Sequence, residues 1–387
     1  MKQYKKLLKA LAHIQVTHPV LTVLFIISLS IGMIAGSGQV RTVASLEQMM
    51  PHDVPEIKAF NILRDNILGQ DTIAIVIELN RDAERGIQDI TDYRIYTYIN
   101  EVSSYLEQQS DILEVYSFST LIGHDLDEES YHHVVESTDL NAYVNPERTI
   151  TMVIATTDVA THDERMLGLA QAVKRIISDQ GYPPGTEIKL TGTPIIQQRL
   201  GELIQSDRAS TQWISTLLVF LITALIFGTF SSAVVPILVV TISVNWLYGT
   251  MGYANLPIST LAGGVAAMVI GIGIDFAIHI MNKFRYERKK GLSIAESIEM
   301  AVVETGTALT ATSITTITAF LAFLVGVMPE MGRFGILMAI GISYSLVFSV
   351  FGLPALLVIE EKVIGFLKRK MRFGVEGEYK LARDNHA

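Results

Sequence analysis

Asp275 is the residue of this chain whose type and position point most directly to chemistry. It lies inside an apolar stretch that runs from about Pro257 to Asn282, well before the first basic residue, Lys283. A carboxylate at membrane depth costs about 2.5–3.5 kcal/mol on insertion scales, and such residues usually mark the path of an ion or a proton. An acid that gains and loses a proton as water access changes can couple proton flow to transport. The alternative is that Asp275 only holds neighbouring helices together through hydrogen bonds.

Four residues lie at four-residue spacing around Asp275 and share its helix face. They are Gly263, Ala267, Gly271 and His279. Because small residues let a neighbouring membrane helix approach closely, this face is predicted to be a small-residue groove that carries one acid and one imidazole. His279 lies one turn beyond the acid, where it could join a proton relay or only line the exit. The sequence leaves both roles open.

The next apolar stretch, from Thr305 to Val327, is unusually rich in hydroxyl side chains. Hydroxyls on successive turns of one membrane helix can hydrogen-bond a carboxyl on a facing helix. Thr312 and Thr316 share one helix face, and Ser313 lies three residues before Thr316. The predicted proton relay therefore consists of Asp275, His279, Thr312, Ser313 and Thr316.

Six apolar stretches are long enough to position these residues across a membrane. The chain is 49% hydrophobic and 18% charged, against about 25% charged in a soluble domain. The first stretch, 19–38, is too long for the core of a secretory signal peptide, so we expect an uncleaved anchor. The other five fall within 211–359, as Thr211–Phe230, Ala233–Tyr253, Pro257–Asn282, Thr305–Val327 and Phe334–Ile359.

Basic residues near the ends of the spans predict the orientation. They gather in the N-terminal segment 1–18, in the loop after Asn282 and in the tail 360–387, and one topology places all three in the cytoplasm. In that loop, Ser293 and Glu296 form a capping box for an amphipathic helix at 292–304 on the inner membrane face. Residues 39–207, with 28 acidic and 12 basic side chains, are then external. We expect a multi-pass protein of the cell membrane with both termini in the cytoplasm.

The external segment alternates between strand-like and helix-like patterns. Strand, helix and strand follow one another over 72–118 and again over 149–190, which predicts two β-α-β units whose helices pack on one sheet. Glu128 and His132 have the spacing of helix-borne metal ligands, but no zinc signature is complete, and we expect a solvated acidic loop without a metal. Cysteine is absent and no nucleotide fingerprint follows the strands, so we expect no cofactor. The net charge of −9 disfavours nucleic acid as a partner.

The fourth and fifth predicted spans resemble the RND superfamily, closest to its MMPL and sterol-sensing branch. The similar residues are Gly271-Ile-Gly-Ile-Asp275-Phe276, the run Arg285-Tyr-Glu-Arg288 and the stretch from Ala295 to Thr318. In the external segment, Ala155-Thr-Thr-Asp158 and Leu190-Thr-Gly-Thr-Pro194 are similar to the porter domain of that superfamily. The resemblance covers essentially the whole chain.

The resemblance implies both a fold and a function. The fold is an α-helical membrane bundle of six spans, one before and five after a single external α+β porter-like domain, which is half of the usual twelve-span chain. The function is that of a secondary active transporter, not an enzyme, in which Asp275 carries the protons that drive export of hydrophobic or amphiphilic, lipid-like substrates. A single half implies a homodimer, with other homo-oligomers left open.

The same resemblance implies which residues pack the helices at the relay. They are Gly263, Ala267, Gly271, Gly273 and Phe276. The MMPL branch usually has tyrosine where this chain has Phe276, so a hydroxyl side chain, His279 or water must replace that phenol.

Three other functions place a chain of this kind in a membrane, and the residues around Asp275 bear on each. A protein-export motor similar to SecD or SecF also splits into halves, but its fourth span continues with a small polar residue and asparagine, unlike Phe276-Ala277-Ile278-His279. A membrane sensor of lipids or sterols would keep the fold without proton flux. An intramembrane aspartyl protease needs two carboxylates that share a proton, and only one aspartate lies at membrane depth here.

Overall fold

The computed structural model describes residues 2–42, 51, 54–63, 72–80, 86–157, 164–228, 230–259 and 261–363. Its contacts divide the chain into two compact units. We call them the helical unit, Met1–Val43 with Ile204–Ala387, and the α+β unit, Ala44–Leu203. Most of the predicted tail 360–387 lies outside the described residues, as does Asp158 of the first porter-like motif.

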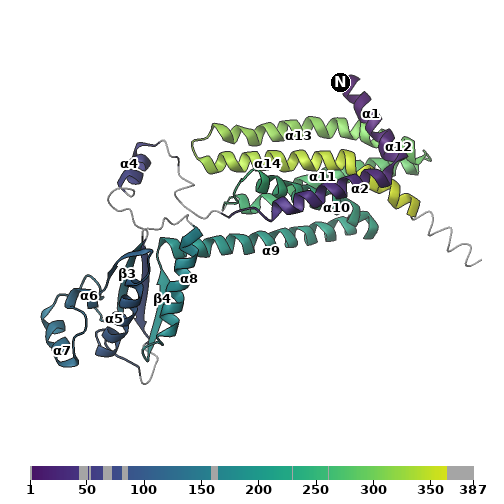
Figure 1. Ribbon diagram of the computed structural model, residues 1–387. Helices are drawn as coiled ribbons and strands as arrows, with labels where there is room; N and C mark the ends of the chain where they lie inside the picture. The colour runs from purple at the N-terminus through teal and green to yellow at the C-terminus, as the bar shows by residue number, and fades with distance from the viewer. Residues whose placement is uncertain are drawn as a thin grey trace, which may run out of the picture. The chain divides into compact units, whose positions relative to one another are not determined.

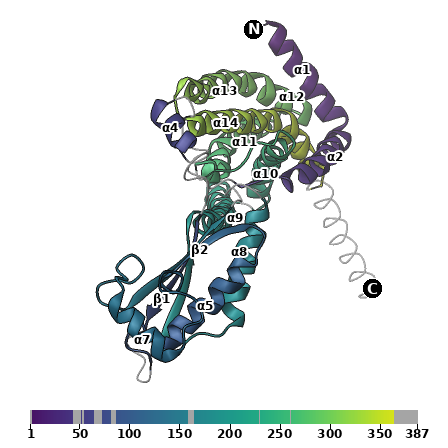
Figure 2. The ribbon, with the colours of Figure 1, turned by 60° about the vertical axis from the view of Figure 1, so that its left-hand side comes forward.

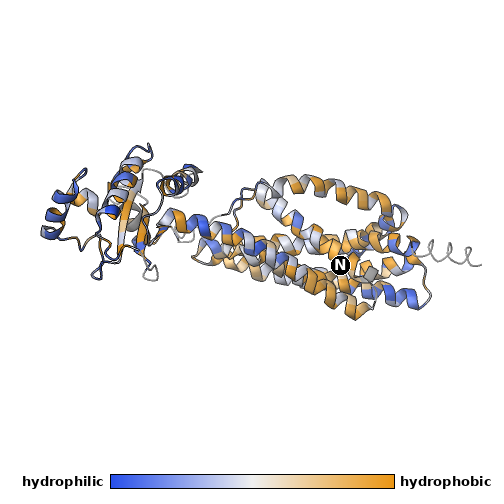
Figure 3. Ribbon diagram, turned by 90° about the horizontal axis from the view of Figure 1, so that it is seen from below, coloured by the Kyte–Doolittle hydropathy of each residue, from blue (hydrophilic) through white to orange (hydrophobic). Residues whose placement is uncertain are grey.

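Six helices of the described residues are long and apolar enough to cross a membrane, as the sequence predicts. Hydrophobic residues dominate them, whereas the α+β unit mixes hydrophilic and hydrophobic residues (Figure 3). The candidate spans are Pro19–Ser37, Thr193–Phe227, Ala233–Tyr253, Ala262–Lys289, Ile294–Val325 and Pro329–Val363.

Figure 1 shows the elements of the helical unit, to which α9 belongs only from Ile204 onward. They are α1 (Lys2–Thr17), α2 (Pro19–Ser37), α9 (Thr193–Phe227), α10 (Phe230–Tyr253), η2 (Ala262–Gly264), α11 (Val265–Lys289), α12 (Ile294–Met300), η3 (Ala301–Thr305), α13 (Gly306–Leu321), η4 (Ala322–Val325), α14 (Pro329–Val347) and η5 (Phe348–Gly352). Of the η segments, η2 and η4 are 3₁₀-helical, and η3 and η5 are π-helical.

Four candidate spans begin at other residues than hydropathy predicts, and one of them is the sixth, which begins at Pro329 instead of Phe334. α9 begins at Thr193 instead of Thr211, because its first turns are helical but polar. The fourth span begins at Ala262 instead of Pro257, because Ile258 pairs with Thr42 in an isolated β-bridge after the turn at Asn255. The helix predicted at 292–304 has the expected capping box, but it continues through η3 into α13, so that both form one candidate span.

α14 and α10 are the helices that join the bundle together. α14 packs against α10, α11 and α13, and α10 packs against α2 and α11 (Figure 1). Between α2 and α10 the backbones nearly touch, since a Cβ added at Gly252 would overlap the carbonyl oxygen of Gly36. Glycine at these positions therefore permits the close crossing that small residues give membrane helices.

The N-terminal segment is a helix, α1, which the sequence predicts only as a basic segment. α1 packs against α12 and η3, and Lys9 forms an ion pair with Glu299 at 2.9 Å. The fully buried Gln15 donates from Nε2 to the carbonyl oxygens of Val350 and Phe351 at 3.0 and 3.1 Å. These carbonyls belong to π-helical η5, so Gln15 ties α1 to a segment whose backbone ladder is irregular.

The α+β unit contains one antiparallel sheet of four strands in the order β2-β3-β1-β4. Its elements are α4 (Pro55–Leu63), β1 (Thr72–Leu79), α5 (Tyr93–Glu107), β2 (Ile112–Tyr116), α6 (Phe118–Ile122), α7 (Glu128–Ser137), β3 (Ile150–Thr157), α8 (Glu164–Asp179) and β4 (Thr186–Thr191). Both predicted β-α-β units are present, but each is split: β3 lies between β1 and β2, and β1 lies between β3 and β4. This interleaving is the ferredoxin-like arrangement.

Helices cover one face of this sheet. Buried and half-buried residues alternate along β1, so Ile73, Ile75 and Ile77 point to the covered face. α5 and α8 pack against each other over that face (Figure 2). The hydrophobic core of the unit therefore lies between these two helices and the sheet.

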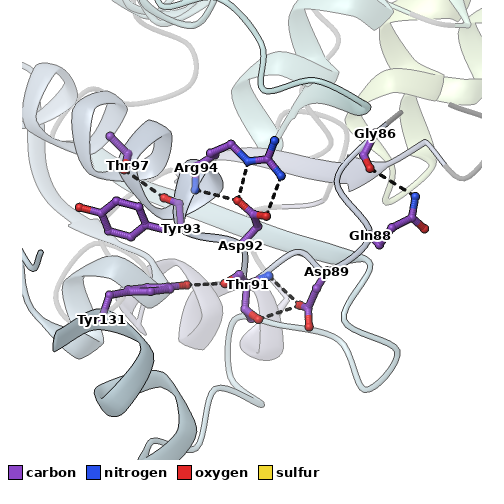
Figure 4. A network of polar contacts seen from close by, with 9 residues as sticks. All are labelled: Gly86, Gln88, Asp89, Thr91, Asp92, Tyr93, Arg94, Thr97 and Tyr131. Carbon is purple, nitrogen blue, oxygen red and sulfur yellow. Dashed lines mark hydrogen bonds and ion pairs between the residues drawn. The ribbon is translucent and has the colours of Figure 1, made fainter. Parts of the chain in front are cut away.

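A polar network fixes the start of α5 (Figure 4). The Asp92 carboxylate caps the helix, because it accepts from the backbone N–H of Arg94 at 2.9 Å and from Nη2 of Arg94 at 2.8 Å. The Tyr131 hydroxyl donates to the carbonyl oxygen of Thr91 at 2.7 Å, which ties α7 to the same turn. Asp89, Asp92 and Tyr131 all bond to groups of this turn, so the network holds the turn in place.

Candidate functional site

α11 carries Asp275, and the bundle holds this helix firmly on one side. α10 and α14 pack against α11. A Cβ added at Gly273 would lie 2.6 Å from Oγ of Ser345 on α14, so only glycine fits there without a shift. Phe276 is buried as well. The orientation of α11 is therefore set by contacts with its neighbours.

The other side of α11 carries the predicted chemistry and is uncovered. Gly271, Asp275 and His279 are all exposed, and Gly263 and Ala267 are half-buried. Gly271, Asp275 and His279 of the predicted face are therefore exposed on α11, whereas Gly263 lies in η2, before that helix begins. No described residue forms a hydrogen bond or an ion pair with Asp275.

Two of the predicted packing residues belong to a different face. Gly273 precedes Asp275 by two residues, which places it about 200° around the helix, and it contacts Ser345. Phe276 follows Asp275 directly and turns into the bundle. These two residues pack α11 against its neighbours and do not line the face of the acid.

Among the described residues, no hydrogen bond joins the hydroxyl side chains of α13 to Asp275. α13 packs against α14, which in turn packs against α11. The hydroxyls of Thr312 and Thr316 donate to carbonyl oxygens of their own helix, those of Leu309 and Thr312, each at 3.0 Å. Ser313 is buried, and its hydroxyl has no partner among the described residues. Their membership of the relay stays a prediction.

One carboxylate that the sequence reasoning missed lies at the end of α11. Glu287 is buried and forms ion pairs with Lys283 at 2.9 Å and Lys290 at 3.3 Å. Lys283 also pairs with Glu304 of η3 at 2.7 Å, so the cluster ties α11 to the segment before α13. The four-residue spacing of Lys283 and Glu287 was a readable signal of this pair.

A second missed carboxylate lies at the start of α14. Glu330 is buried and accepts from the backbone N–H of Leu261 at 3.2 Å, just before η2. No spacing pattern in the sequence signals this contact, because it joins segments 69 residues apart. Glu330 holds the beginning of the fourth span against the sixth.

The described part of the α+β unit offers no metal site. Within the described ranges, no group of three or more His, Asp or Glu side chains could hold a metal ion. The acidic run around Glu128 and His132 is mostly α7, whose first turn is capped by Asp127 through the backbone N–H of Ser130 at 3.1 Å.

The fold and this face define a multi-pass membrane protein with an α+β unit inserted between candidate spans. The sequence matches the MMPL family over residues 48–373, and the chain belongs to that family. Members of this family are transporters and not enzymes. The resemblance found in the residues around Asp275 is thereby confirmed.

Individual relatives agree with this assignment. The chain is 31% identical to the putative membrane protein MJ1562 of Methanocaldococcus jannaschii, covering 95% of this chain and 97% of that protein. It is 25% identical to the trehalose monomycolate exporter MmpL3 of Mycolicibacterium smegmatis, over 45% of this chain and 19% of the exporter.

A solved structure shares the fold. The hedgehog release protein Disp of the water bear Hypsibius dujardini superposes with a TM-score of 0.60 at 12% identity. The match covers 92% of this chain and 49% of that protein, so this chain spans about half of its length.

Proposed function

We propose that this protein exports hydrophobic or amphiphilic, lipid-like substrates across the cell membrane, driven by protons that Asp275 carries. Relatives that export trehalose monomycolate support a lipid-like substrate. In this proposal both termini are cytoplasmic and residues 39–207 are external, in agreement with the distribution of basic and acidic residues.

The observation that carries the proposal is the uncovered acid and imidazole on α11. Asp275 has no structural partner among the described residues, although it lies in a candidate span of mean hydropathy 1.9. A carboxylate left in contact with lipid would cost about 2.5–3.5 kcal/mol. Water or a second protein surface must therefore cover this face, and either one gives the carboxyl a partner for proton exchange.

A second copy of the chain is the covering surface that we propose. A twofold axis beside α11 would bring the two uncovered faces together. The chain spans 49% of the hedgehog release protein, which fits one half of a two-part assembly. In such a homodimer, Thr312, Ser313 and Thr316 act on Asp275 through water or from the partner copy, and His279 extends the relay.

Proton flux in reconstituted vesicles tests the function. Vesicles of phosphatidylethanolamine and phosphatidylglycerol, whose lipids serve as the lipid-like substrate, hold an internal pH dye and receive an imposed proton gradient. We expect Asp275→Asn to reduce flux to the level of empty vesicles, because the amide cannot release a proton, while the variant still assembles. Asp92→Asn, in the α+β unit, is the matched control and retains full flux.

Two outcomes contradict the proposal. Equal flux for the native protein and Asp275→Asn removes Asp275 from the proton path. No flux above empty vesicles for the native protein favours the membrane sensor of lipids instead.

A further inference from the structure

A groove of about 540 Å³ lies within the α+β unit, between α8 and the first turns of α9. β4 forms its floor, and Figure 1 shows α8 beside that strand. Ile188 and Leu190 of β4 pair with Ile77 and Ile75 of β1, so they point to the helix-covered face of the sheet. The groove exists because β4 is an edge strand and the pair of α5 and α8 leaves part of it open.

The floor of the groove is apolar. Ile177 of α8 and Ile195 of α9 join the two β4 side chains in its lining. Ile177 is buried, and the other three are half-buried. The volume lies within the range of about 300–1,000 Å³ that is typical of sites for small molecules.

The rim of the groove carries two cations and one carboxylate. Arg199 is paired with Glu202, since Nη1 lies 2.8 Å from Oε2 of the carboxylate. Lys174 lines the groove from α8, and no described carboxylate forms an ion pair with it. The rim therefore carries one excess positive charge. This is unusual for its surroundings, because residues 39–207 contain 28 acidic and 12 basic side chains.

We propose that this groove binds an amphiphile that consists of one acyl chain and an anionic headgroup. The chain lies on the isoleucine and leucine floor, and the headgroup meets the ammonium group of Lys174. Such a ligand matches both the apolar floor and the unpaired cation. The inference rests on the proposed function, because it makes the groove a site that holds the exported substrate on the external side.

Photo-labelling of the full-length protein tests the site. The probe is palmitate with a diazirine in its chain, added at low salt to protein in phosphatidylcholine nanodiscs, and labelled peptides are identified by mass spectrometry. We expect labels within 170–202. Lys174→Gln should reduce labelling at subsaturating probe about threefold, because Lys174 is exposed and solvent screens its charge. Arg175→Gln, one position further on α8 and outside the lining, should leave it unchanged.

Two further experiments distinguish the contribution of the ligand's headgroup from that of its acyl chain. The corresponding diazirine alcohol should label the native protein as weakly as palmitate labels Lys174→Gln, and it should not respond to that substitution. Ser178→Trp, which fills the groove from α8, should remove labelling by both probes. Equal labelling of Lys174→Gln and Arg175→Gln overturns the role of the headgroup. Unchanged labelling of Ser178→Trp, or a cross-link from the groove to a second copy, overturns the site.

The test separates this inference from the proposed function. Labelling needs no proton gradient, so Asp275→Asn should be labelled as strongly as the native protein. If the groove takes no probe while Asp275→Asn still loses flux, only the groove assignment fails. If the groove is labelled but the native protein carries no flux, only the proton-driven export fails.

Discussion

Asp92 and Asp275 show two different uses of the same side chain in the two units. Asp92 caps α5 and is bound by the backbone and the guanidinium of Arg94 (Figure 4). Asp275 lies mid-helix in an apolar span and has no hydrogen bond or ion pair with any described residue. No contact with a described residue of the protomer offsets the free-energy cost of placing the Asp275 carboxylate in an apolar span. Asp275 is therefore the acid of the two that we expect to have a function.

The two sides of α11 sharpen this comparison. The side against α14 is specified by shape, since Gly273 has no room for a Cβ beside Ser345. The side of Asp275 is open, and a Cβ added at Gly271 meets no atom within 4 Å. Substitutions on the first side should therefore disturb folding of the protomer, and substitutions on the second should disturb only function or assembly.

Gly273→Ala should produce the larger change in stability. Overpacking of a tight contact costs typically about 1–3 kcal/mol, so the thermal unfolding temperature in nanodiscs should fall by several degrees. Gly271→Ala is the matched control and should leave that temperature unchanged or slightly higher, because alanine favours the helix. Ser345→Gly combined with Gly273→Ala should restore stability. Equal effects of the two alanines would show that the sides of α11 do not differ.

Asp92→Asn should produce a smaller change, and one that depends on pH. The hydrogen bond from the Arg94 side chain holds the pKa of Asp92 below its usual range. Its contribution is therefore present above the unfolded value of about 3.9 and is lost as the pH falls through the folded value. Asparagine still caps the helix, so at pH 7 the substitution removes only the ion pair with exposed Arg94 and should cost about 0.2–1 kcal/mol. Hydrogen exchange of the first turn of α5 measures this cost. Near pH 2 native and variant should converge, and a constant difference would contradict the assignment.

The sequence predicted where the helices and strands lie along the chain better than it predicted which elements pack or pair with one another. Hydropathy located all six candidate spans, because length and apolar composition are local properties. It missed the polar first turns of α9, and it gave no sign that α1 is a helix that donates to η5. The β-α-β patterns were readable, but the insertion of β3 between β1 and β2 depends on long-range pairing that no local pattern encodes.

The candidate site divides in the same way. Four-residue spacing predicted Gly271, Asp275 and His279 on one face, and all three are exposed on α11. Gly273 and Phe276 were predicted to pack the helices at the relay, and both are buried against the bundle, away from the face of the acid. The residue pattern of α13 does not encode which helix packs against it. In the structure α14 packs against α13.

The central claim is that a second copy covers the Asp275 face of α11. Because the chain contains no cysteine, one introduced cysteine reports on one position. Met268 lies seven residues before Asp275 on the same side of α11, and Leu225 is an exposed residue of α9. We expect Met268→Cys to form a disulfide-linked dimer in native membranes and Leu225→Cys to stay monomeric. A cross-linked Leu225→Cys together with an unlinked Met268→Cys would contradict the account.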